Sequence, residues 1–513
     1  MANGDERMDN ENKLPIIYVR GYAGTQNEVE DTVDDPFYGF NKGATHIRVG
    51  PAGDPQFFAF ESPLVRLMSD HGYCDVFEGD RISTRQLDET RKSIWIYRYY
   101  DRTSKTFKEE GGFRLTIEEA AKGLRDLIIQ VKEQTEARHV ILIAHSMGGL
   151  ICRSLIQKIY REDAQGRSIP EQMPATAHIH KLFTYGTPHG GIHFDVGGGT
   201  LEWIRDQLGW NHADDFGRQR MYEYLTPGAK PNDKVPEKFI PNDLDGAFPV
   251  DRVFCVVGTN ARDYDVAYGL SRRSVGPQSD GLVQIEHAYV KNSHRAYIHR
   301  SHSGRYGMVN SEEGYQCLQR FLFGDVKIHA TLLDIDLPEK DNTFYQAEVR
   351  ISIRTLPSLV HEQTVGHYCP ISLHQIKHPT RYPLFTAFLM HKTKPSKMRD
   401  DEFDPTMRYA LGLTVHSFTR HNGLFSFTDH IESMPRWSDW LIFDVTPHAG
   451  SNSALYSAKC SWLSKNAQPT DTVNFNLDTD DDDSLTARIS VPAEAFPVLG
   501  HNCKIELRTY NWK

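Results

Sequence analysis

Hydrophobic residues in the first three-fifths of the chain alternate between short continuous runs and helical stripes. The continuous runs are typical of strands buried on both faces of a parallel sheet. They stand at 16–19, 94–97, 140–143, 181–185 and 253–257. Between the second and third runs, a capping box at Thr116 and Glu119 precedes apolar positions that fall on one helix face over 117–131. This alternation predicts an open, mostly parallel α/β sheet.

After residue 325 the hydrophobic period changes from that of helices to that of strands. Residues 347–353 alternate apolar and polar side chains, and turn residues rather than helical stripes separate the segments that follow. Other strand-like segments stand at 327–333, 385–390, 411–418, 440–445, 455–462, 485–491 and 504–510. The pattern predicts an antiparallel, all-β sandwich.

The two patterns divide the chain into parts. We expect a polar tail at 1–13, an α/β domain at 14–325 and a β-sandwich domain at 326–513. Residues 194–249 interrupt the strand–helix alternation and carry aromatic and aliphatic residues at partly helical spacing. This insertion is predicted to be a lid or cap over the sheet. Its spacing fits a lid that opens and a helical cap that is permanently packed equally well.

Composition excludes several classes of protein. With 26 Phe, 23 Tyr and 7 Trp in 513 residues, the chain has ample apolar area for packed cores and is not mainly disordered. No stretch approaches the roughly 20 consecutive apolar residues of a spanning helix, so we expect no transmembrane segment. The formal charge of −10 gives no global attraction for phosphate backbones, and no nucleic-acid partner is expected.

Cysteine spacing and the N-terminus bear on the cellular compartment. The 7 cysteines are irregularly spaced without a CxxC pair, which argues against a disulfide or zinc scaffold and favours a reducing compartment. The N-terminal residues lack the apolar segment of a signal peptide. Cytoplasmic residence is therefore the default expectation, and export without a cleaved leader is left open.

The strongest chemical signal is Ser146 in the segment Ala144-His145-Ser146-Met147-Gly148-Gly149, which joins the run 140–143 to a helical segment. A serine on a tight strand-to-helix turn needs small residues two positions to either side, and Ala144 and Gly148 supply them. The turn exposes the serine hydroxyl at the carboxyl edge of the sheet. The N–H groups of the following helix then lie near any anion that forms there. Ser146 is therefore the predicted nucleophile.

A serine nucleophile needs a base and a carboxylate that orients the base. Asp280 lies in the loop that follows the run 253–257, and His302 lies in a loop before the last helical segment of the first domain. The chain order Ser146, Asp280, His302 matches a known hydrolase order of nucleophile, acid and histidine. The alternatives are Asp263 and Asp265 for the acid, and His294 and His299 for the base.

These motifs resemble the lipase and esterase branch of the α/β-hydrolase superfamily. The segment 185–191, Tyr-Gly-Thr-Pro-His-Gly-Gly, is particularly similar to triacylglycerol lipases and to the inositol-deacylase and cholesterol-acyltransferase relatives. The resemblance covers the first domain only. It implies an α/β-hydrolase fold, with Ser146 as nucleophile, His302 as base and Asp280 as its orienting acid.

The resemblance also implies an oxyanion hole. Arg20-Gly21-Tyr22-Ala23-Gly24 stands where those enzymes carry His-Gly and an oxyanion residue. The oxyanion-hole groups would be the backbone N–H groups of Tyr22 and Met147. Arg20 replaces the usual histidine, so the hydrogen bond that holds this loop in the relatives has no counterpart in the sequence.

No cofactor or metal is expected. His178, His180, His189 and His193 lack a helical His-x-x-x-His spacing with a carboxylate partner. His189 is expected to serve the turn or the substrate pocket rather than proton transfer. The acidic run Asp480–Asp483 lacks the glycine and the spaced ligands of a calcium loop and is more typical of a solvated hairpin tip.

The expected function is that of a serine hydrolase of the lipase/esterase type, which cleaves carboxylic esters through an acyl-enzyme on Ser146. A phospholipase A or an acyltransferase acting on membrane lipid is the alternative. A catalytically inactive binding protein is less favoured, because the order of Ser, Asp and His is complete. The expected partner is an ester or lipid substrate, with the lid and the β-sandwich as candidate contacts to a lipid surface.

Overall fold

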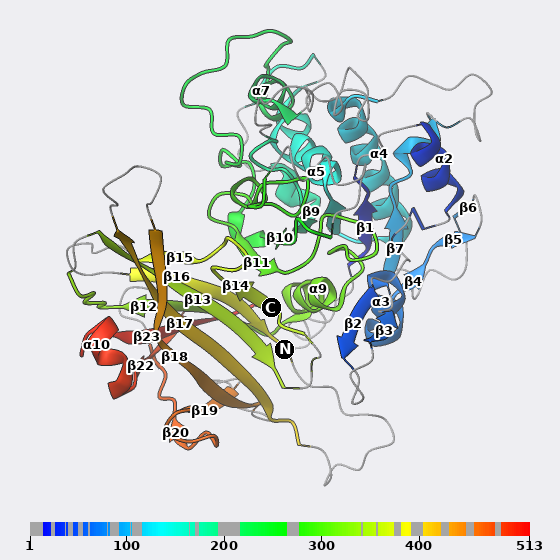
Figure 1. Cartoon of the computed structure of the whole chain (residues 1–513). Helices are drawn as coiled ribbons and strands as arrows, with labels where there is room; N and C mark the ends of the chain where they lie inside the picture. The colour runs from blue at the N-terminus through cyan, green and yellow to red at the C-terminus, as the bar shows by residue number, and fades with distance from the viewer. Residues whose placement is uncertain are drawn as a thin grey trace. The chain divides into compact units, whose positions relative to one another are not determined.

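The computed structural model of the chain is shown in Figure 1. It describes residues 14–21, 26–35, 37–38, 40, 45–49, 55–59, 62–78, 81–82, 92–102, 104, 115–163, 165–169, 174–192, 216–263, 276–339, 342–354, 356, 358–373, 381–390, 404–421, 430–447, 456–477 and 484–512. The account that follows is confined to these residues.

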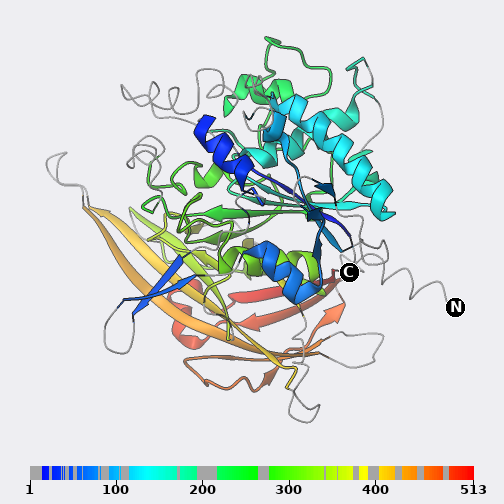
Figure 2. The same ribbon diagram turned by 90° about the vertical axis from the view of Figure 1, so that its right-hand side faces the viewer.

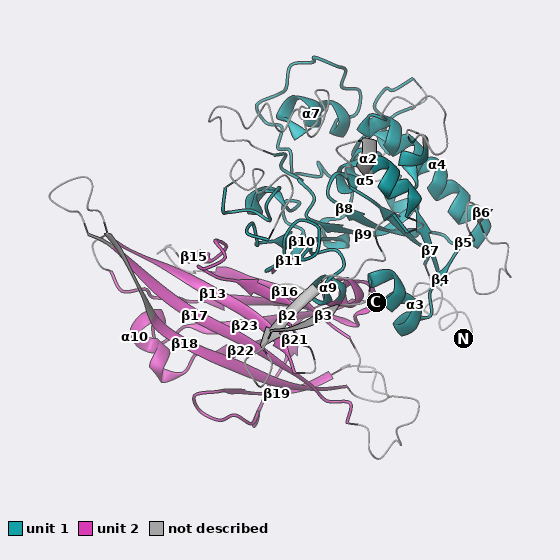
Figure 3. Ribbon diagram, turned by 45° about the vertical axis from the view of Figure 1, so that its right-hand side comes forward, with its two compact units in different colours: residues 1–295, 299–315 teal, residues 296–298, 316–513 magenta. Residues whose placement is uncertain are grey.

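The chain forms two compact units (Figure 3). The first comprises Met1–Arg295 and His299–Tyr315, and the second comprises Ala296–Ile298 and Gln316–Lys513. The boundary between the two units therefore lies inside helix α9 (Glu312–Phe323) and not after it. The domain limits 14–325 and 326–513 stay a prediction.

A seven-stranded sheet is the centre of the first unit, with the strand order β11-β10-β9-β8-β1-β7-β4. The strands are β1 (Ile16–Val19), β4 (Cys74–Asp75), β7 (Ser93–Ile96), β8 (Val140–His145), β9 (Ile179–Tyr185), β10 (Val253–Gly258) and β11 (His294–Ile298). From β4 to β10 every neighbouring pair is parallel. The continuous apolar runs are the central strands, and all four residues of β1 are fully buried. The predicted parallel α/β sheet is confirmed.

Helices cover both faces of this sheet. Figures 1 and 2 show α4 (Ile117–Thr135) and α5 (Met147–Gln157) on one face and α3 (Pro63–His71) on the other. The predicted capping box begins α4, since Thr116 Oγ1 accepts from the Glu119 N–H at 3.2 Å and Glu119 Oε2 accepts from the Thr116 N–H at 2.8 Å. Shorter elements are α2 (Gln26–Asp34), β2 (Thr45–Val49), β3 (Pro55–Ala59), β5 (Phe77–Glu78), β6 (Arg81–Ile82) and the 3₁₀ turns η2 (Tyr99–Arg102), η3 (Ile159–Arg161), η4 (Pro174–Ala177), η6 (Val250–Arg252) and η8 (Ile285–His287).

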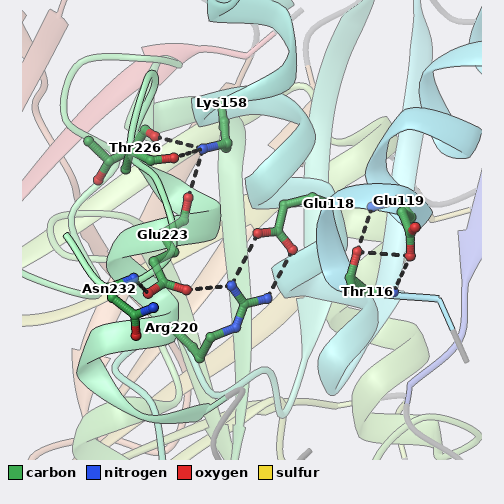
Figure 4. A network of polar contacts seen from close by, with 9 residues as sticks. Thr116, Glu118, Glu119, Lys158, Arg220, Glu223, Thr226 and Asn232 are labelled. Atoms are coloured by element: carbon green, nitrogen blue, oxygen red, sulfur yellow. Dashed lines mark hydrogen bonds and ion pairs between the residues drawn. The ribbon is translucent and has the colours of Figure 1, made fainter. Parts of the chain in front are cut away.

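Residues 216–249, the described part of the insertion, are anchored to the helices beneath them. Lys158 Nζ, at the end of α5, donates to the backbone oxygens of Glu223, Thr226 and Ala229 at 2.8, 3.2 and 2.9 Å (Figure 4). Arg220, on α7 (Arg218–Leu225), forms ion pairs with Glu223 and with Glu118 of α4. These contacts fasten residues 216–249 to α4 and α5, and the choice between lid and cap stays a prediction. Residues 194–215 of the predicted lid lie outside the described residues.

After α9, the second unit consists of antiparallel β-sheets, as predicted for residues 326–513. One sheet has the order β16-β12-β23-β22-β21, and the other has the order β14-β13-β17-β18-β19-β20 with β15 beside β13. The strands are β12 (Val326–Leu333), β13 (Thr343–Ile353), β14 (His361–Gln363), β15 (Ile371–Leu373), β16 (Arg381–Leu389), β17 (Met407–His421), β18 (His430–Pro447), β19 (Tyr456–Trp462), β20 (Asp471–Thr472), β21 (Asn476–Leu477), β22 (Ser484–Ser490) and β23 (Lys504–Asn511). All their recorded pairings are antiparallel, and the turns η10 (Ala493–Ala495) and α10 (Phe496–Leu499) precede β23.

Apolar side chains from both sheets form a common core in this unit. In the described part of the chain, no helix is long and apolar enough to cross a bilayer.

Candidate active site

Ser146 occupies the tight turn between β8 and α5 that the sequence predicted. Its φ of 53° and ψ of −128° are unusual for a residue with a side chain, and such strain clusters at functional sites. Gly148 explains why the turn needs small residues, because a Cβ at that position would lie 2.3 Å from the Val19 carbonyl oxygen. On the other side, a Cβ on Gly21 would lie 2.6 Å from the Ser146 Cβ. The chain is therefore tightly packed around the turn that carries Ser146.

The strained turn is held by contacts to β9 and to the loop after it. The Ser146 N–H donates to the Tyr185 carbonyl oxygen at 2.9 Å. The Ser146 carbonyl oxygen accepts from the Thr187 hydroxyl at 2.8 Å and from the Gly149 N–H at 3.0 Å. Thr187 belongs to the Gly-Thr-Pro-His-Gly segment that carried the family resemblance. Its position shows what that segment does, namely to fasten the turn that presents Ser146.

The structure brings Ser146, His302 and Asp280 together. His302 Nε2 lies 3.0 Å from Ser146 Oγ, and His302 Nδ1 lies 2.8 Å from Asp280 Oδ2. All three residues are buried, with exposed fractions of 6%, 3% and 0%. An ionised carboxylate only accepts hydrogen bonds, so Nδ1 carries the proton and Nε2 is left to accept from the Ser146 hydroxyl.

The backbone orients the Asp280 carboxylate. Its Oδ1 accepts from the N–H groups of Leu282 and Val283 at 3.0 and 2.8 Å, which leaves Oδ2 for the imidazole. The His302 N–H in turn donates to the Asp280 carbonyl oxygen at 2.9 Å, so the two loops are also joined through the main chain. Gly186 and Gly258 leave room for the carboxylate, because a Cβ on either would approach Asp280 within 3.0 and 2.8 Å respectively.

The alternative acid and bases lie elsewhere. Asp263 is exposed and accepts from Asn260 Nδ2 at 2.6 Å, and Asp265 lies outside the described residues. His299 Nδ1 lies 3.3 Å from the Thr259 hydroxyl. The Ser146 hydroxyl has His302 as its partner, and neither His294 nor His299 contacts it.

Met147, one of the two predicted oxyanion-hole residues, is the first residue of α5. The N–H groups of the first turn of a helix have no acceptor within the helix, so the Met147 N–H is available to an anion at Ser146. Tyr22, the other predicted residue, lies outside the described residues.

Tyrosines hold the loop in which Arg20 replaces the usual histidine. The Tyr99 hydroxyl lies 3.0 Å from the carbonyl oxygens of both Arg20 and Gly21, and the Tyr100 hydroxyl donates to the Gly21 oxygen at 3.1 Å. Burial raises the pKa of Tyr99 well above its ordinary value, so the hydroxyl stays a donor. The Arg20 guanidinium donates to the carbonyl oxygen of Tyr38. Sequence reasoning missed both tyrosines, because they stand about 80 positions downstream of the loop they hold.

His145 is a further residue that the sequence did not single out. Its Nε2 lies 3.0 Å from the His302 carbonyl oxygen, which can only accept, so Nε2 carries the proton. The two imidazoles lie 4.9 Å apart between ring centroids. Burial, and then the neighbouring His302, lower the pKa of His145 well below its ordinary value, so it remains neutral. His145 therefore braces the loop that carries His302.

The histidines considered as metal ligands are spread over separate environments. His178 stacks on Tyr160 at 4.8 Å, and His189 is buried with its Nε2 3.1 Å from the Thr184 hydroxyl. His193 and Asp480–Asp483 lie outside the described residues. Within the described ranges, no group of three or more His, Cys, Asp or Glu side chains could hold a metal ion.

Comparison with known proteins agrees with the motif analysis. Residues 82–219 match the family described as "Putative serine esterase (DUF676)", a segment that contains Ser146 and Thr187 but ends before Asp280. No curated protein matches the chain. The resemblance to the lipase and esterase branch is confirmed, and the match supports a serine hydrolase.

Two solved structures are also similar to this chain. The lin2722 gene product from Listeria innocua is 15% identical, with 60% of this chain and 93% of that chain covered and a TM-score of 0.25. Bacillus licheniformis lipase BlEst2 in mature form is 13% identical, with 61% and 91% covered and a TM-score of 0.29.

Proposed function

We propose that the chain is a carboxylic ester hydrolase that works through an acyl-enzyme on Ser146. The observation that carries the proposal is the hydrogen-bonded series from Ser146 Oγ through His302 to Asp280 Oδ2, with distances of 3.0 and 2.8 Å. A serine hydroxyl is a weak nucleophile at neutral pH, and this series supplies a base and an acid that orients the base.

The reaction proceeds in two halves. In the first, Ser146 Oγ attacks the ester carbonyl while His302 Nε2 takes the hydroxyl proton, and Asp280 stabilises the imidazolium that forms. The protonated His302 then gives the proton to the departing alcohol. In the second half, His302 takes a proton from water, the hydroxide attacks the acyl group, and the acid leaves as Ser146 regains its proton.

The negative charge that develops on the carbonyl oxygen needs donors that are already in place. We assign this role to the Met147 N–H at the start of α5 and, from the family resemblance, to the Tyr22 N–H. Thr187 fastens the turn that precedes Met147, and the hydroxyls of Tyr99 and Tyr100 hold the carbonyl groups of Arg20 and Gly21. Removal of one oxyanion-hole donor typically costs about 100- to 1,000-fold in kcat.

The first test is covalent labelling with a fluorophosphonate, followed by mass mapping of the modified peptide. We expect one adduct per chain on Ser146 and none in Ser146→Ala. Ser154→Ala is the matched control, because Ser154 is a fully buried serine on the same helix and should leave labelling unchanged. A folded wild-type protein that takes no adduct would support the inactive binding protein instead.

The second test identifies the substrate class. Aryl esters of increasing acyl length, a triglyceride and a phosphatidylcholine are supplied separately, with and without an acceptor alcohol. Release of free acid from the carboxylic esters, whether or not the alcohol is present, supports the hydrolase. Preferential release from phosphatidylcholine would indicate a phospholipase A, and acyl transfer to the alcohol would indicate an acyltransferase.

A further inference from the structure

The β-sandwich contains a large apolar cavity that the proposed ester hydrolysis does not use. The cavity measures about 550 Å³ and lies between the two sheets of the second unit. Its walls include Ile328 and Phe385 from one sheet and Leu411 and Phe443 from the other. Ligand sites typically span about 300–1,000 Å³ and have mostly apolar walls, so this cavity has the size and the surface of a ligand site.

The interior of the sandwich is densely packed on one side of the cavity and loosely packed around it. Leu332 and Ile505 of one sheet and Leu413 and Val415 of the other are fully buried. Ile328 lies on the same strand as Leu332 and is only partly buried. Other hydrophobic wall residues are also only partly buried, namely Phe385, Tyr409, Tyr456, Ala458 and Phe475. Protein interiors are normally as dense as organic crystals, so these side chains leave apolar surface that a ligand can cover.

The cavity is elongated across the strands. Each strand of the five-stranded sheet, in the order β16-β12-β23-β22-β21, contributes a wall residue: Ala387, Ile328, Leu507, Leu485 and Leu477. Neighbouring strands lie about 4.8 Å apart, so five strands extend over about 19 Å. A volume of about 550 Å³ spread over this length leaves a cross-section of roughly 30 Å². Such a space admits one extended aliphatic chain and is too narrow for two side by side.

The opposite wall follows the same direction. Trp462 Nε1 on β19 donates to the Ser490 carbonyl oxygen on β22 at 3.0 Å, which joins the two sheets at one side. At the other side, the rings of His361 on β14 and Phe385 on β16 lie 6.3 Å apart between centroids. Between these contacts, β13, β17, β18 and β19 all contribute residues to the wall. The cavity therefore runs across both sheets.

One end of the cavity reaches the surface, and the other end is closed. At the β21 end the wall includes Leu477, whose side chain is 72% exposed. At the opposite end it includes Leu389 of β16 and Ile351 of β13, and both are buried. A chain can therefore enter beside Leu477 and extend toward β16.

The walls of the cavity carry no charge. None of the described residues that line it is Asp, Glu, Lys, Arg or His. The Tyr456 hydroxyl donates to Asp325 Oδ2 at 3.0 Å, and the Tyr409 hydroxyl accepts from Arg320 Nη1 at 3.4 Å. Thr509 Oγ1 donates to a backbone carbonyl oxygen of β22 at 3.3 Å. A ligand between the described wall residues thus finds apolar contacts and no counter-charge, and burial of a charged group there would be costly.

From the uncharged apolar walls and the width of a single chain, we infer that the β-sandwich binds one uncharged aliphatic chain, which enters beside Leu477 and extends between the sheets toward β16. An apolar cavity of about 150 Å³ is enough for benzene, so about 550 Å³ leaves room for a chain of about a dozen carbons or more. A polar end of the ligand would stay in water at Leu477. The site is built from the second unit alone and does not depend on Ser146.

The test is a calorimetric titration of the full chain with linear primary alcohols from octanol to dodecanol. We expect one alcohol per chain, with an affinity that rises roughly 4-fold for each added methylene, the usual worth of burying one such group. The heat capacity change of binding should be negative. Cyclododecanol has as many carbons as dodecanol in a wider body and should bind about 10-fold more weakly or worse. Absence of saturable binding of the linear alcohols, or equal binding of cyclododecanol, would overturn the inference.

Two variants locate the chain in the cavity. Ala458→Phe adds a ring to the wall at β19 and should abolish dodecanol binding. Ser457→Phe is the matched control, because Ser457 is exposed at the neighbouring position of the same strand and should leave binding unchanged. Ala387→Phe fills the closed end, so octanol should still bind while the gain in affinity from octanol to dodecanol is lost.

Arg488→Gln is a second control, since Arg488 is an exposed arginine on β22 that is paired with Glu506 and does not line the cavity. Its titrations should match those of the unaltered chain. Circular dichroism shows which of the variants are folded. Undiminished dodecanol binding in a folded Ala458→Phe or Ala387→Phe variant would place the ligand elsewhere and overturn the inference.

Discussion

At the carboxyl edge of the parallel sheet, each side chain of the Ser146–His302–Asp280 series has a polar partner, whereas the β-sandwich encloses a cavity of about 550 Å³ whose walls are mostly apolar. The difference follows from how the two regions are built. Parallel strands end at the same edge, so the turn of Ser146 after β8 and the loop of Asp280 after β10 converge there. Antiparallel sheets instead leave a wall of inward-facing apolar side chains, and a space between them has few polar groups of its own.

The comparison suggests that one region is arranged for chemistry and the other for binding. At the edge of the parallel sheet, backbone N–H groups hold the Asp280 carboxylate, and His145 Nε2 contacts the His302 carbonyl oxygen. These side chains therefore need little rearrangement during the reaction. In the second region, the apolar walls have no directional contacts to lose, and recognition of a ligand depends on the shape of the cavity. Variants at the sheet edge should therefore change the rate of catalysis, and variants in the cavity should change the binding of a ligand.

The largest expected effect tests the fully partnered series. Ser146→Ala and His302→Ala should each lower kcat on a soluble aryl ester by roughly 10³- to 10⁶-fold, and the double variant should be little worse than either single one, because the residues act as a unit. Steady-state kinetics measure this effect. His299→Ala and Arg488→Gln are the controls and should retain activity. Loss of activity in His299→Ala with activity retained in His302→Ala would contradict the assignment of the base.

The second prediction concerns pH and the stability of the two regions. Burial lowers the pKa of His145 and His189 well below the ordinary value and that of His180 to about 3. Below about pH 6.5 the unfolded chain binds protons at these sites while the folded chain does not, so the free energy of unfolding falls as pH falls. Each histidine contributes up to about 1.4 kcal/mol per pH unit. In the second unit, burial lowers the pKa of His329 to about 4, so this histidine makes the same kind of contribution there.

Hydrogen exchange at pH 7.5 and pH 5.5 measures this difference region by region. We expect the hydrolase-like unit to lose more protection at pH 5.5 than the β-sandwich does. His180→Asn removes one of these buried histidines. The first unit should then lose less protection between pH 7.5 and pH 5.5, by the contribution of a single histidine. An equal loss of protection in both units would be evidence against the buried histidines as its cause.

The third prediction concerns Lys158, the buried cation that fastens residues 216–249 to the end of α5. Lys158→Met leaves the three carbonyl oxygens that Lys158 now contacts without this donor, so the free energy of unfolding should fall by about 3 kcal/mol. Urea unfolding measures the change. Lys291→Met is the control, since Lys291 forms an exposed ion pair with Asp243 and should cost less than about 1 kcal/mol. Similar losses in the two variants would mean that the cap is not anchored by Lys158.

The smallest expected effect concerns His145 as a positioning residue. His145→Leu removes the N–H that braces the His302 carbonyl and should lower kcat by about 10-fold with KM little changed. His145→Gln keeps an amide donor and should recover part of the loss. Kinetics of both variants, together with the rate of fluorophosphonate labelling, measure the effect. A rise in KM without a fall in kcat would assign His145 to substrate binding instead.

Much of the fold could be predicted from the sequence, because strand and helix periods are local properties of the chain. The run 140–143 and the small residues around Ser146 specify strand, turn and helix within a dozen positions. The capping box at Thr116 is equally local. In the β half, two-residue alternation was enough to predict antiparallel sheets, although it did not reveal which end of the sandwich is densely packed.

By itself, then, the sequence determined the order Ser146, Asp280, His302 and the turn that presents the serine, since both depend on near neighbours in the chain. Only the tertiary structure showed that Asp280 contacts His302 and that His302 contacts Ser146, and only it joined the tyrosines to the Arg20 loop and His145 to His302. It also decided that a cavity lies between the two sheets of the β-sandwich. These features join residues that are tens to hundreds of positions apart, and their contacts exist only when the sheets bring distant segments to the same edge or wall.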